Sequence, residues 1–280
     1  MPPRKRKVAE PDVIQHLNDI VELRVLQVIQ DGGAKRSTVY LIECQRRLLK
    51  ESPTEIASQP STCVLKTFPP NVFHEGLFQR EVAAYTELQR STAANDPEEA
   101  WAVLSSYHAE PASWPFCFGR LQIPGSEEPL QVGGGWIRPS QPVPRPSGAK
   151  QRRGLLLEHI PDLTSLTVDR LDDELVAMVR RVTSELHACN VVHGDLVDHA
   201  SWPHIGFGNI FLRKREGSGV EEVFLMDFNR SRIVGPHPRD QAMAREEEEQ
   251  MADLLGRALE KKMAIDEVPK EVRKLLGLKN

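Results

Sequence analysis

The sequence predicts an α+β fold with two unequal lobes, because strand patterns fill the first half of the chain and helical patterns the second. The length of 280 residues suffices for one large domain or two small lobes. Hydrophobic residues make up 40% of the chain and charged residues 27%, an ordinary globular composition. We therefore expect a first lobe built on strands, a mainly helical second lobe, and a cleft between them.

Four strands are expected in the first lobe. Leu23–Cys44 has the pattern of two strands joined by a turn at Gly32 and Gly33. Ser61–Phe68 is a third apolar strand, which ends because two prolines follow it. Leu155–Ile160 is an apolar run with the length of a buried strand.

Three helices are expected, at His74–Arg90, Leu171–Asn190 and Arg245–Lys262. The second has apolar residues at spacings of three and four, which indicates one buried face. The strand Glu221–Phe228 precedes the last helix, and a short helix is expected to close the chain.

We place the lobe boundary after Ile160, so that residues 12–160 form the first lobe and residues 161–280 the second. Residues 133–154 are rich in Gly, Pro and basic residues, which predicts a mobile loop. Residues 1–11 are expected to be disordered. Their basic run Arg4–Lys7 resembles a nuclear import signal, although a short basic start without that role has the same composition.

The composition argues against several classes of protein. A net charge of −4 does not favour direct binding of nucleic acid. The four cysteines lie far apart, which argues against a disulfide framework or a zinc knuckle and fits a reducing compartment. No apolar run approaches the roughly 18 residues of a membrane span, and no signal peptide is apparent. We expect a soluble intracellular protein, cytoplasmic or nuclear, without a membrane partner.

A lysine and a glutamate occupy positions that should face the core. Lys66 lies at the centre of the third strand, where a lysine either extends to an edge or binds a negative partner. Glu81 shares a helical face with Leu77 and Tyr85, and a buried carboxylate needs a cation. We therefore expect Lys66 to pair with Glu81, as in a clamp for nucleotide phosphates. A solvated Glu81 at the margin of the apolar face is the alternative.

Three polar residues accompany short apolar runs in the second lobe. Asn209 precedes one apolar strand and Asp227 ends another, so a hairpin between these strands would bring the two residues together. Amide and carboxylate oxygens of this kind can bind Mg²⁺. Asp195 would lie nearby as a free carboxylate, able to orient or deprotonate a hydroxyl group.

Six motifs occur in the order found in protein-kinase-like phosphotransferases, which the chain resembles over roughly residues 20–260. They are VLK at 64–66, Glu81, LLLEHI at 155–160, HGD at 193–195, Asn209 and DFN at 227–229. HGD in place of the commoner HRD is similar to the aminoglycoside-phosphotransferase and atypical small-kinase branches, and the layout also resembles fungal kinase-like proteins of unassigned substrate. The resemblance implies a two-lobed protein-kinase-like fold, with an antiparallel sheet in the first lobe and a shortened, mainly helical second lobe. It also implies the transfer of the γ-phosphoryl group of ATP to a hydroxyl of a protein or small molecule.

The resemblance also implies how the nucleotide is bound. Lys66 would contact the α- and β-phosphates and pair with Glu81, and the turn at Gly32 and Gly33 would cover the phosphates. Adenine would be bound by backbone groups of Leu157, Glu158 and His159.

Catalytic roles are implied for the second lobe. Asp195 would be the catalytic base, and Asn209 and Asp227 would hold Mg²⁺. His193 would have a structural role in the loop around Asp195. Asp253, on the helix after the metal-binding strand, would brace the catalytic loop.

The chain departs from the family pattern at several points. The first hairpin lacks the GxGxxG pattern, and DFN ends in Asn229 where the family has glycine. We expect Asn229 to accept a left-handed backbone in place of that glycine. Thirteen residues separate Asp195 from Asn209, where kinases usually have four, so an insert at Asp198–Gly206 should bulge from the surface. No APE-like motif follows, so the platform for peptide substrates is expected to be reduced or missing, which favours a small-molecule or atypical substrate, or none.

These departures keep a second function open, a pseudokinase that binds nucleotide or acts as a scaffold without catalysis. Two other kinds of metal-dependent site are disfavoured by the sequence. The GD and GN dipeptides resemble a metallophosphoesterase pattern, but the upstream DxH is absent. A metal site formed by His193, His199 and His204 is disfavoured because their spacings fit neither one helix face nor an HExxH pair. The acceptor, partners and oligomeric state are not indicated by the sequence.

Overall fold

The computed structural model describes residues 17, 20–32, 36–46, 61–91, 113–123, 130, 137, 152–196, 207–214 and 219–266. The chain divides into two compact units. Unit 1 comprises Met1–Pro70, Gln89–Ser105 and Cys117–Leu157, and unit 2 comprises Asn71–Leu88, Ser106–Phe116 and Glu158–Asn280. The first predicted helix thus belongs mostly to unit 2, and the longest stretch of unit 2 begins three residues before the expected boundary.

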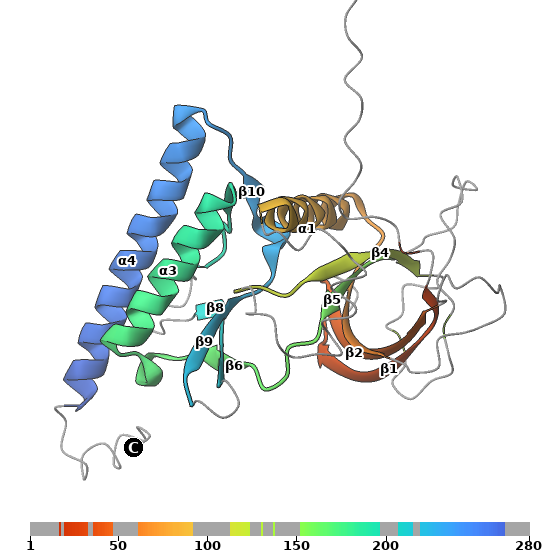
Figure 1. Cartoon of the computed structure of the whole chain (residues 1–280), viewed down its shortest axis with the longest axis horizontal. Helices are drawn as coiled ribbons and strands as arrows, with labels where there is room; N and C mark the ends of the chain where they lie inside the picture. The colour runs from red at the N-terminus through yellow and green to blue at the C-terminus, as the bar shows by residue number, and fades with distance from the viewer. Residues whose placement is uncertain are drawn as a thin grey trace, which may run out of the picture. The chain divides into compact units, whose positions relative to one another are not determined.

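Unit 1 is built on a five-stranded sheet with the order β1-β2-β3-β5-β4 (Figure 1). Its strands are β1 Ile20–Gln30, β2 Thr38–Arg46, β3 Ser61–Phe68, β4 Cys117–Ile123 and β5 Arg152–Glu158. The pairs β1–β2, β2–β3 and β4–β5 are antiparallel, as the sequence predicts for this lobe. The fully buried Tyr40 and Leu65 lie opposite each other in the β2–β3 register, within the apolar core of the sheet.

Within its described residues, unit 2 contains three long helices and two small sheets. The helices are α1 Val72–Ser91, of which the part up to Leu88 lies in this unit, α3 Asp173–Ala188 and α4 Pro238–Asp266. One sheet has the order β6-β8-β9, with β6 Thr164–Leu166, β8 Phe207–Lys214 and β9 Glu221–Leu225. The other pairs β7 Val191–Val192 with β10 Arg232–Ile233. Two short 3-10 helices are Val168–Arg170 and Phe228–Arg230.

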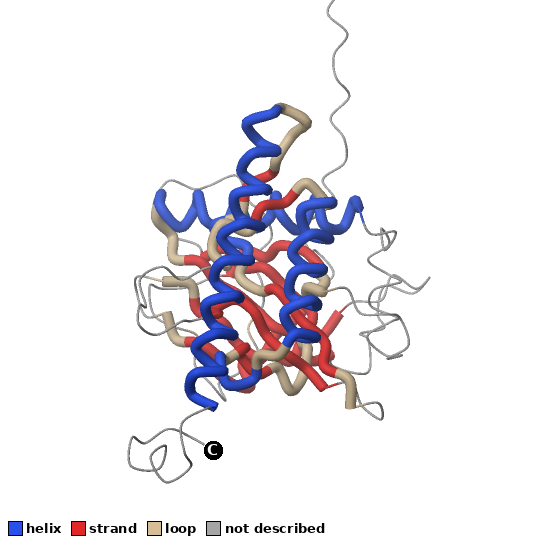
Figure 2. Tube along the Cα trace, turned by 90° about the vertical axis from the view of Figure 1, so that its left-hand side faces the viewer, coloured by secondary structure: helices blue, strands red, loops and turns tan. Residues whose placement is uncertain are grey.

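Helix α3 shows how the sequence sets the ends of an element. Asp172 caps its start by accepting a hydrogen bond from the amide of Leu175 at 2.8 Å. The helix ends before Asn190, whose φ of 59° is left-handed and cannot continue it. Its buried residues are Leu175, Val179, Val182, Thr183 and Leu186. This face packs the helix into unit 2, where α3 and α4 lie side by side (Figures 1 and 2).

Most predicted elements are found, but two details differ. Helix α4 is longer than predicted, since it begins at Pro238, a residue favoured in the first turn of a helix. Strands β4, β6, β7 and β10 were not predicted as strands, and β7 and β10 have only two residues each. The basic segment Arg4–Lys7, the insert Asp198–Gly206, the closing helix and most of the loop 133–154 lie outside the described residues.

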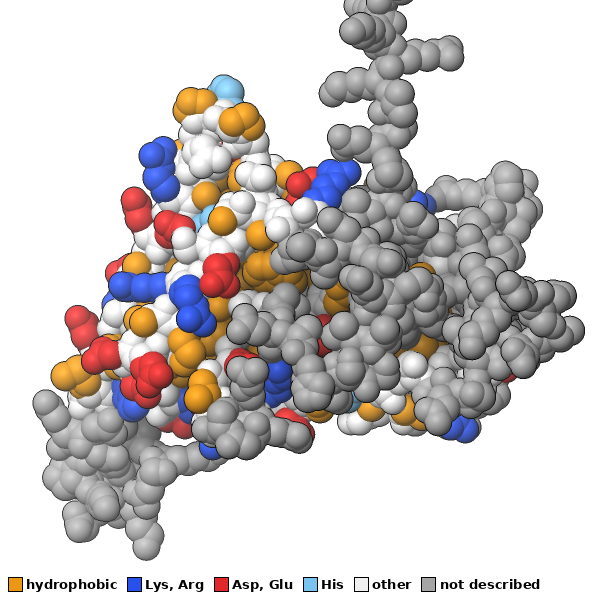
Figure 3. All heavy atoms as spheres, viewed as in Figure 1, with side chains coloured by type: hydrophobic (Ala, Val, Ile, Leu, Met, Phe, Trp, Pro, Cys, Tyr) orange, Lys and Arg blue, Asp and Glu red, His pale blue; other side chains and the backbone are white. Residues whose placement is uncertain are grey.

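Within the part of the chain that the structure describes, no helix has both the length and the apolar character needed to cross a membrane. Acidic and basic side chains are interspersed over the visible face of α3 and α4 (Figure 3).

Candidate active site

The residues predicted to be catalytic follow strand β7 in unit 2. Val191 and Val192 are buried and pair with β10, so they anchor the start of the loop. His193 and Leu196 are also buried, whereas the side chain of Asp195 keeps 32% of its surface exposed. The loop is therefore held at both ends of the segment 193–196, with Asp195 turned to the surface.

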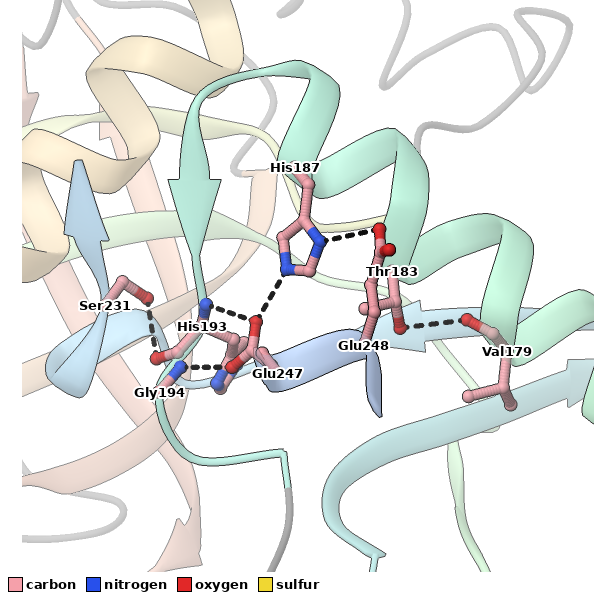
Figure 4. Close-up of polar contacts among 8 residues, drawn as sticks. All are labelled: Val179, Thr183, His187, His193, Gly194, Ser231, Glu247 and Glu248. Atoms are coloured by element: carbon pink, nitrogen blue, oxygen red, sulfur yellow. Dashed lines mark hydrogen bonds and ion pairs between the residues drawn. The ribbon is translucent and has the colours of Figure 1, made fainter. Parts of the chain in front are cut away.

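Glu247 on α4 fixes the backbone of this loop. Its carboxylate accepts hydrogen bonds from the amides of His193 at 3.0 Å and Gly194 at 2.6 Å (Figure 4). The side chain is buried, so these bonds are little weakened by water. The prediction that Asp253 does this was wrong, because Asp253 is exposed and pairs with Arg257 on its own helix at 2.6 Å.

Gly194 is required by the geometry of the loop. Its φ of 75° is left-handed, and a Cβ atom would lie 2.8 Å from the carbonyl oxygen of Arg230. A larger residue between His193 and Asp195 would require the backbone at Arg230 to move, which is a physical reason for the glycine in HGD.

His187 on α3 compensates the buried charge of Glu247. Its Nε2 lies 2.8 Å from Glu247, and its Nδ1 lies 3.0 Å from Glu248 (Figure 4). Because ionised carboxylates only accept hydrogen bonds, both ring nitrogens must carry protons and the ring is an imidazolium. Burial lowers the pKa of His187, but the hydrogen bonds to Glu247 and Glu248 outweigh burial and raise the pKa.

The pKa of Glu247 responds in the opposite direction. Burial raises it, but the hydrogen bonds from His187, Gly194 and His193 prevail and hold the pKa below its usual value. Glu247 therefore stays ionised and can bind both loop amides. On α3, the nearby Thr183 satisfies its buried hydroxyl by donating to the carbonyl of Val179 at 2.9 Å (Figure 4).

His193 ties the loop to the segment that contains Asp227. Its Nε2 donates to the carbonyl oxygen of Met226 at 2.8 Å, and its ring packs against Phe228 with centroids 4.9 Å apart. Its carbonyl accepts from the hydroxyl of Ser231 at 3.2 Å (Figure 4). Burial lowers the pKa of His193, so the ring is neutral, as expected of a structural histidine.

Asn209 contacts the predicted catalytic base directly. Its Nδ2 donates to the backbone oxygen of Asp195 at 2.8 Å and to Oδ2 of Asp195 at 3.3 Å. Asn209 lies inside β8, not before it as predicted, and its carbonyl accepts from the amide of Met226 at 3.0 Å. The predicted hairpin is present as the antiparallel pair β8–β9, which brings the backbone next to Asp227 beside that of Asn209.

Asn209 and Asp227 are suitable ligands for Mg²⁺. The amide nitrogen of Asn209 is engaged with Asp195, so its side-chain oxygen is the atom left for a cation. Mg²⁺ is often bound by one or two protein oxygen ligands together with substrate phosphates, which fits this donor set. The left-handed residue of the DFN motif is Asp227, with φ of 64°, so the expectation for Asn229 was wrong.

Two arginines lie at the same loop and were not predicted to have a role. Nη1 of Arg230 lies 3.0 Å from Oδ1 of Asp195, so this carboxylate is paired and not free as expected. Nε of Arg80, on α1, donates to the carbonyl of Asn229 at 3.1 Å. Arginines on surface segments carry no sequence signal that distinguishes them, and only the fold reveals these contacts.

The residues predicted to bind the phosphates lie in both units. In unit 1, Lys66 is only 4% exposed on β3, with Nζ 5.4 Å from the ring centroid of Phe68. The turn contains Gly32, whose carbonyl accepts from the amide of Arg36 at 3.1 Å, and Gly33 is outside the described residues. In unit 2, Glu81 is fully buried on α1, so the solvated alternative is wrong. The pairing of Lys66 with Glu81 stays a prediction.

The segment predicted to bind adenine begins with the buried Leu157 at the end of unit 1. In unit 2, the amide of Glu158 donates to the carbonyl of Phe116 at 2.8 Å, so that amide is already used. Burial raises the pKa of the Glu158 carboxyl, although the amide of Phe116 donates to it. Burial lowers the pKa of His159. Backbone contacts of adenine with Leu157 and His159 stay predictions.

No family model and no curated protein matches the sequence. A solved structure to which the chain is similar is that of the Cydia pomonella granulovirus kinase, PK-1. The two are 15% identical, with a TM-score of 0.37, and the match covers 76% of this chain and 53% of that chain. The chain thus spans about half the length of the structure it matches. Since this TM-score is too low to support an argument, function has to be argued from the residues of the site itself.

Proposed function

We propose that the chain is a kinase-like phosphotransferase that uses ATP and Mg²⁺ to phosphorylate a hydroxyl group. The observation that supports this most is the arrangement of Asp195 and Asn209. Asp195 lies in the loop after β7, where the amides of His193 and Gly194 donate to the buried Glu247. Asn209 lies in the β8–β9 hairpin, where its carbonyl accepts from the amide of Met226. Such fixed positions are what phosphoryl transfer needs, because its catalysis comes mostly from positioning and electrostatics.

Each residue of the site has a defined task in this proposal. Asp195 orients the hydroxyl of the acceptor and accepts its proton as the new oxygen–phosphorus bond forms. The bond between the γ-phosphorus and the bridging oxygen breaks, and ADP leaves with that oxygen. Asn209 and Asp227 would hold Mg²⁺, which when bound neutralises charge on the phosphate oxygens. Asn209 also keeps Asp195 in place through its Nδ2 atom.

Further residues would bind the nucleotide. Lys66 would contact the α- and β-phosphates, and Glu81 would hold Lys66 in position. Both side chains are buried, and a buried lysine or glutamate is costly unless each has a partner of opposite charge. The turn at Gly32 and Gly33 would cover the phosphates, and adenine would contact the backbone of Leu157 and His159.

One observation favours the alternative of a pseudokinase. Arg230 pairs with Asp195, so the carboxylate that would accept the proton is already engaged in an ion pair. In this alternative the chain binds nucleotide or a protein partner without transferring phosphate. The ion pair is partly exposed, with 63% of the Arg230 side chain accessible, so it can be exchanged for another contact.

A thermal-melt titration with ATP, in the presence and absence of Mg²⁺, tests the proposal. A ligand at about one hundred times its dissociation constant adds about 2.7 kcal/mol to the free energy of unfolding. We expect a Mg²⁺-dependent rise in Tm for the wild type, its loss in Asp227→Ala, and its retention in the matched control Asp253→Ala. Asp195→Asn should keep the rise but lower phosphotransfer by about a hundredfold or more.

The outcomes separate the two functions. A Tm rise without any phosphotransfer from ATP to an acceptor or to water would identify a pseudokinase. The absence of a rise in every condition would remove nucleotide from the function altogether.

A further inference from the structure

A cavity of about 600 Å³ lies beside Asp195 within unit 2. Its walls come from α1, from the loop after β7, from the segment that leads into β10, and from α4. The charged residues of its lining are Arg80, Asp195, Arg230, Arg232, Glu246 and Glu247. Because Asp195 is the proposed base, whatever occupies this cavity is placed to present a hydroxyl group to it.

Three of these charges are already engaged inside the protein. Arg230 pairs with Asp195, and Glu247 is bound by His187 and the two loop amides. Three charges are left to meet a ligand, and two of them are arginines.

The two remaining arginines differ in how they are held. Nε of Arg80 is fixed by the carbonyl of Asn229, which orients the guanidinium and leaves its Nη atoms for other acceptors. Arg232 is exposed on β10 and forms no ion pair with any described residue. The third charge is Glu246, which is exposed and accepts a hydrogen bond from Gln250 at 3.3 Å. The accessible lining therefore carries an excess of positive charge.

The apolar part of the lining indicates the shape of the ligand. Phe73, Leu77 and Met243 contribute apolar surface, and Phe73 keeps 68% of its area exposed. Cavities for small molecules usually bury about 70–90% of the ligand surface. Walls as open as Phe73 and Arg230 suit a chain segment that passes through the cavity better than a small enclosed molecule.

We propose that this cavity binds a short acidic peptide segment, whose carboxylates contact Arg80 and Arg232 and whose serine or threonine hydroxyl reaches Asp195. The inference rests on the proposed function, since it names the acceptor of the same reaction. It is supported by charge complementarity between the segment and the two arginines, and by apolar contact with Phe73.

The acidic segment also resolves the pairing of Arg230 with Asp195. A carboxylate of the segment can take over Arg230, because an ion pair as exposed as this one is readily exchanged. Asp195 is then released to accept the proton of the acceptor hydroxyl. The acceptor segment thus frees Asp195, the base that acts on its own hydroxyl. Without the segment, Asp195 stays paired with Arg230, and ATP is protected from reaction with water.

The test uses three serine peptides of equal length, flanked by aspartates, by glutamines or by lysines. Phosphate transfer from γ-labelled ATP is measured for the full chain, for Arg80→Glu with Arg232→Glu, and for Arg180→Glu as a matched control. Arg180 is exposed on α3 and is not part of the cavity lining. We expect kcat/KM for the acidic peptide to exceed that for the neutral one by about tenfold or more.

The double variant should lose this preference mainly through KM, because like charges then face each other, while Arg180→Glu should keep it. Equal transfer to all three peptides, a preference for the basic peptide, or an unchanged preference in the double variant would overturn the inference. Phe73→Ala, which keeps all charges, should weaken binding of the acidic peptide, and serves if the double variant fails to fold.

Fluorescence anisotropy of the labelled peptides, without ATP, separates this inference from the proposed reaction. Binding of the acidic peptide that is lost in the double variant supports the peptide site even if no phosphate is transferred, and the reaction then fails alone. Phosphate transfer without selective binding of the acidic peptide overturns the peptide site and leaves the reaction standing.

Discussion

The charge state of a single histidine affects how the loop 193–196 is held. His187 stands between Glu247 and Glu248, and its positive charge offsets that of the buried Glu247. Without a proton on each nitrogen, one carboxylate would face a lone pair instead of a donor. The anchoring of His193 and Gly194 is thus linked to a group that titrates near neutral pH.

This linkage predicts a pH dependence of stability. Since folding raises the pKa of His187, its contribution to the free energy of unfolding is fully present below about pH 6.5, the usual histidine pKa. The contribution is lost as pH rises through the raised pKa. We expect the urea midpoint to fall more steeply above about pH 6.5 in the wild type than in His187→Gln. Parallel curves for the two proteins would show that His187 is not the titrating group.

At the level of elements, α4 supports the loop 193–196 through Glu247. The helix carries four consecutive glutamates at 246–249, and only its register decides that Glu247 is buried while its neighbours are exposed. The sequence alone could not single out Glu247, because all four residues are alike. In contrast, the β8–β9 hairpin and strand β3 could be predicted, since apolar runs bounded by turn residues and prolines are local signals.

Truncation of Glu247 tests the support that α4 gives. Glu247→Ala removes the acceptor of two backbone amides and leaves His187, whose side chain is largely buried, with Glu248 as its remaining carboxylate partner. We expect the free energy of unfolding to fall by about 3 kcal/mol or more, as when one member of a buried pair is removed. Asp253→Ala, also on α4, should stay within about 0.5 kcal/mol of the wild type. Urea unfolding measures both, and equal midpoints would contradict the role of Glu247.

For the molecule as a whole, the sequence predicted the α+β class, the antiparallel sheet and most long elements. It could do so because hydrophobic periodicity depends on local spacing, which the chain itself displays. The side-chain contacts within the site could not be predicted from local spacing. Arg230 with Asp195, and His187 with Glu247, join residues 35 and 60 positions apart, and nothing in their local sequence marks them as partners.

The left-handed backbone of Asp227 has a consequence for the stability of the entire fold. A non-glycine residue with φ near 64° costs about 1 kcal/mol, which glycine would avoid. We therefore expect Asp227→Gly to leave the urea midpoint unchanged or raise it, while Asp227→Ala lowers it. A lower midpoint for Asp227→Gly than for Asp227→Ala would contradict this.

At Asp227, stability favours glycine, whereas the proposed activity favours the carboxylate. A chain with only a scaffolding role would become more robust by exchanging this carboxylate for glycine. The strained backbone of Asp227 is a reason to test whether its carboxylate binds the proposed cation.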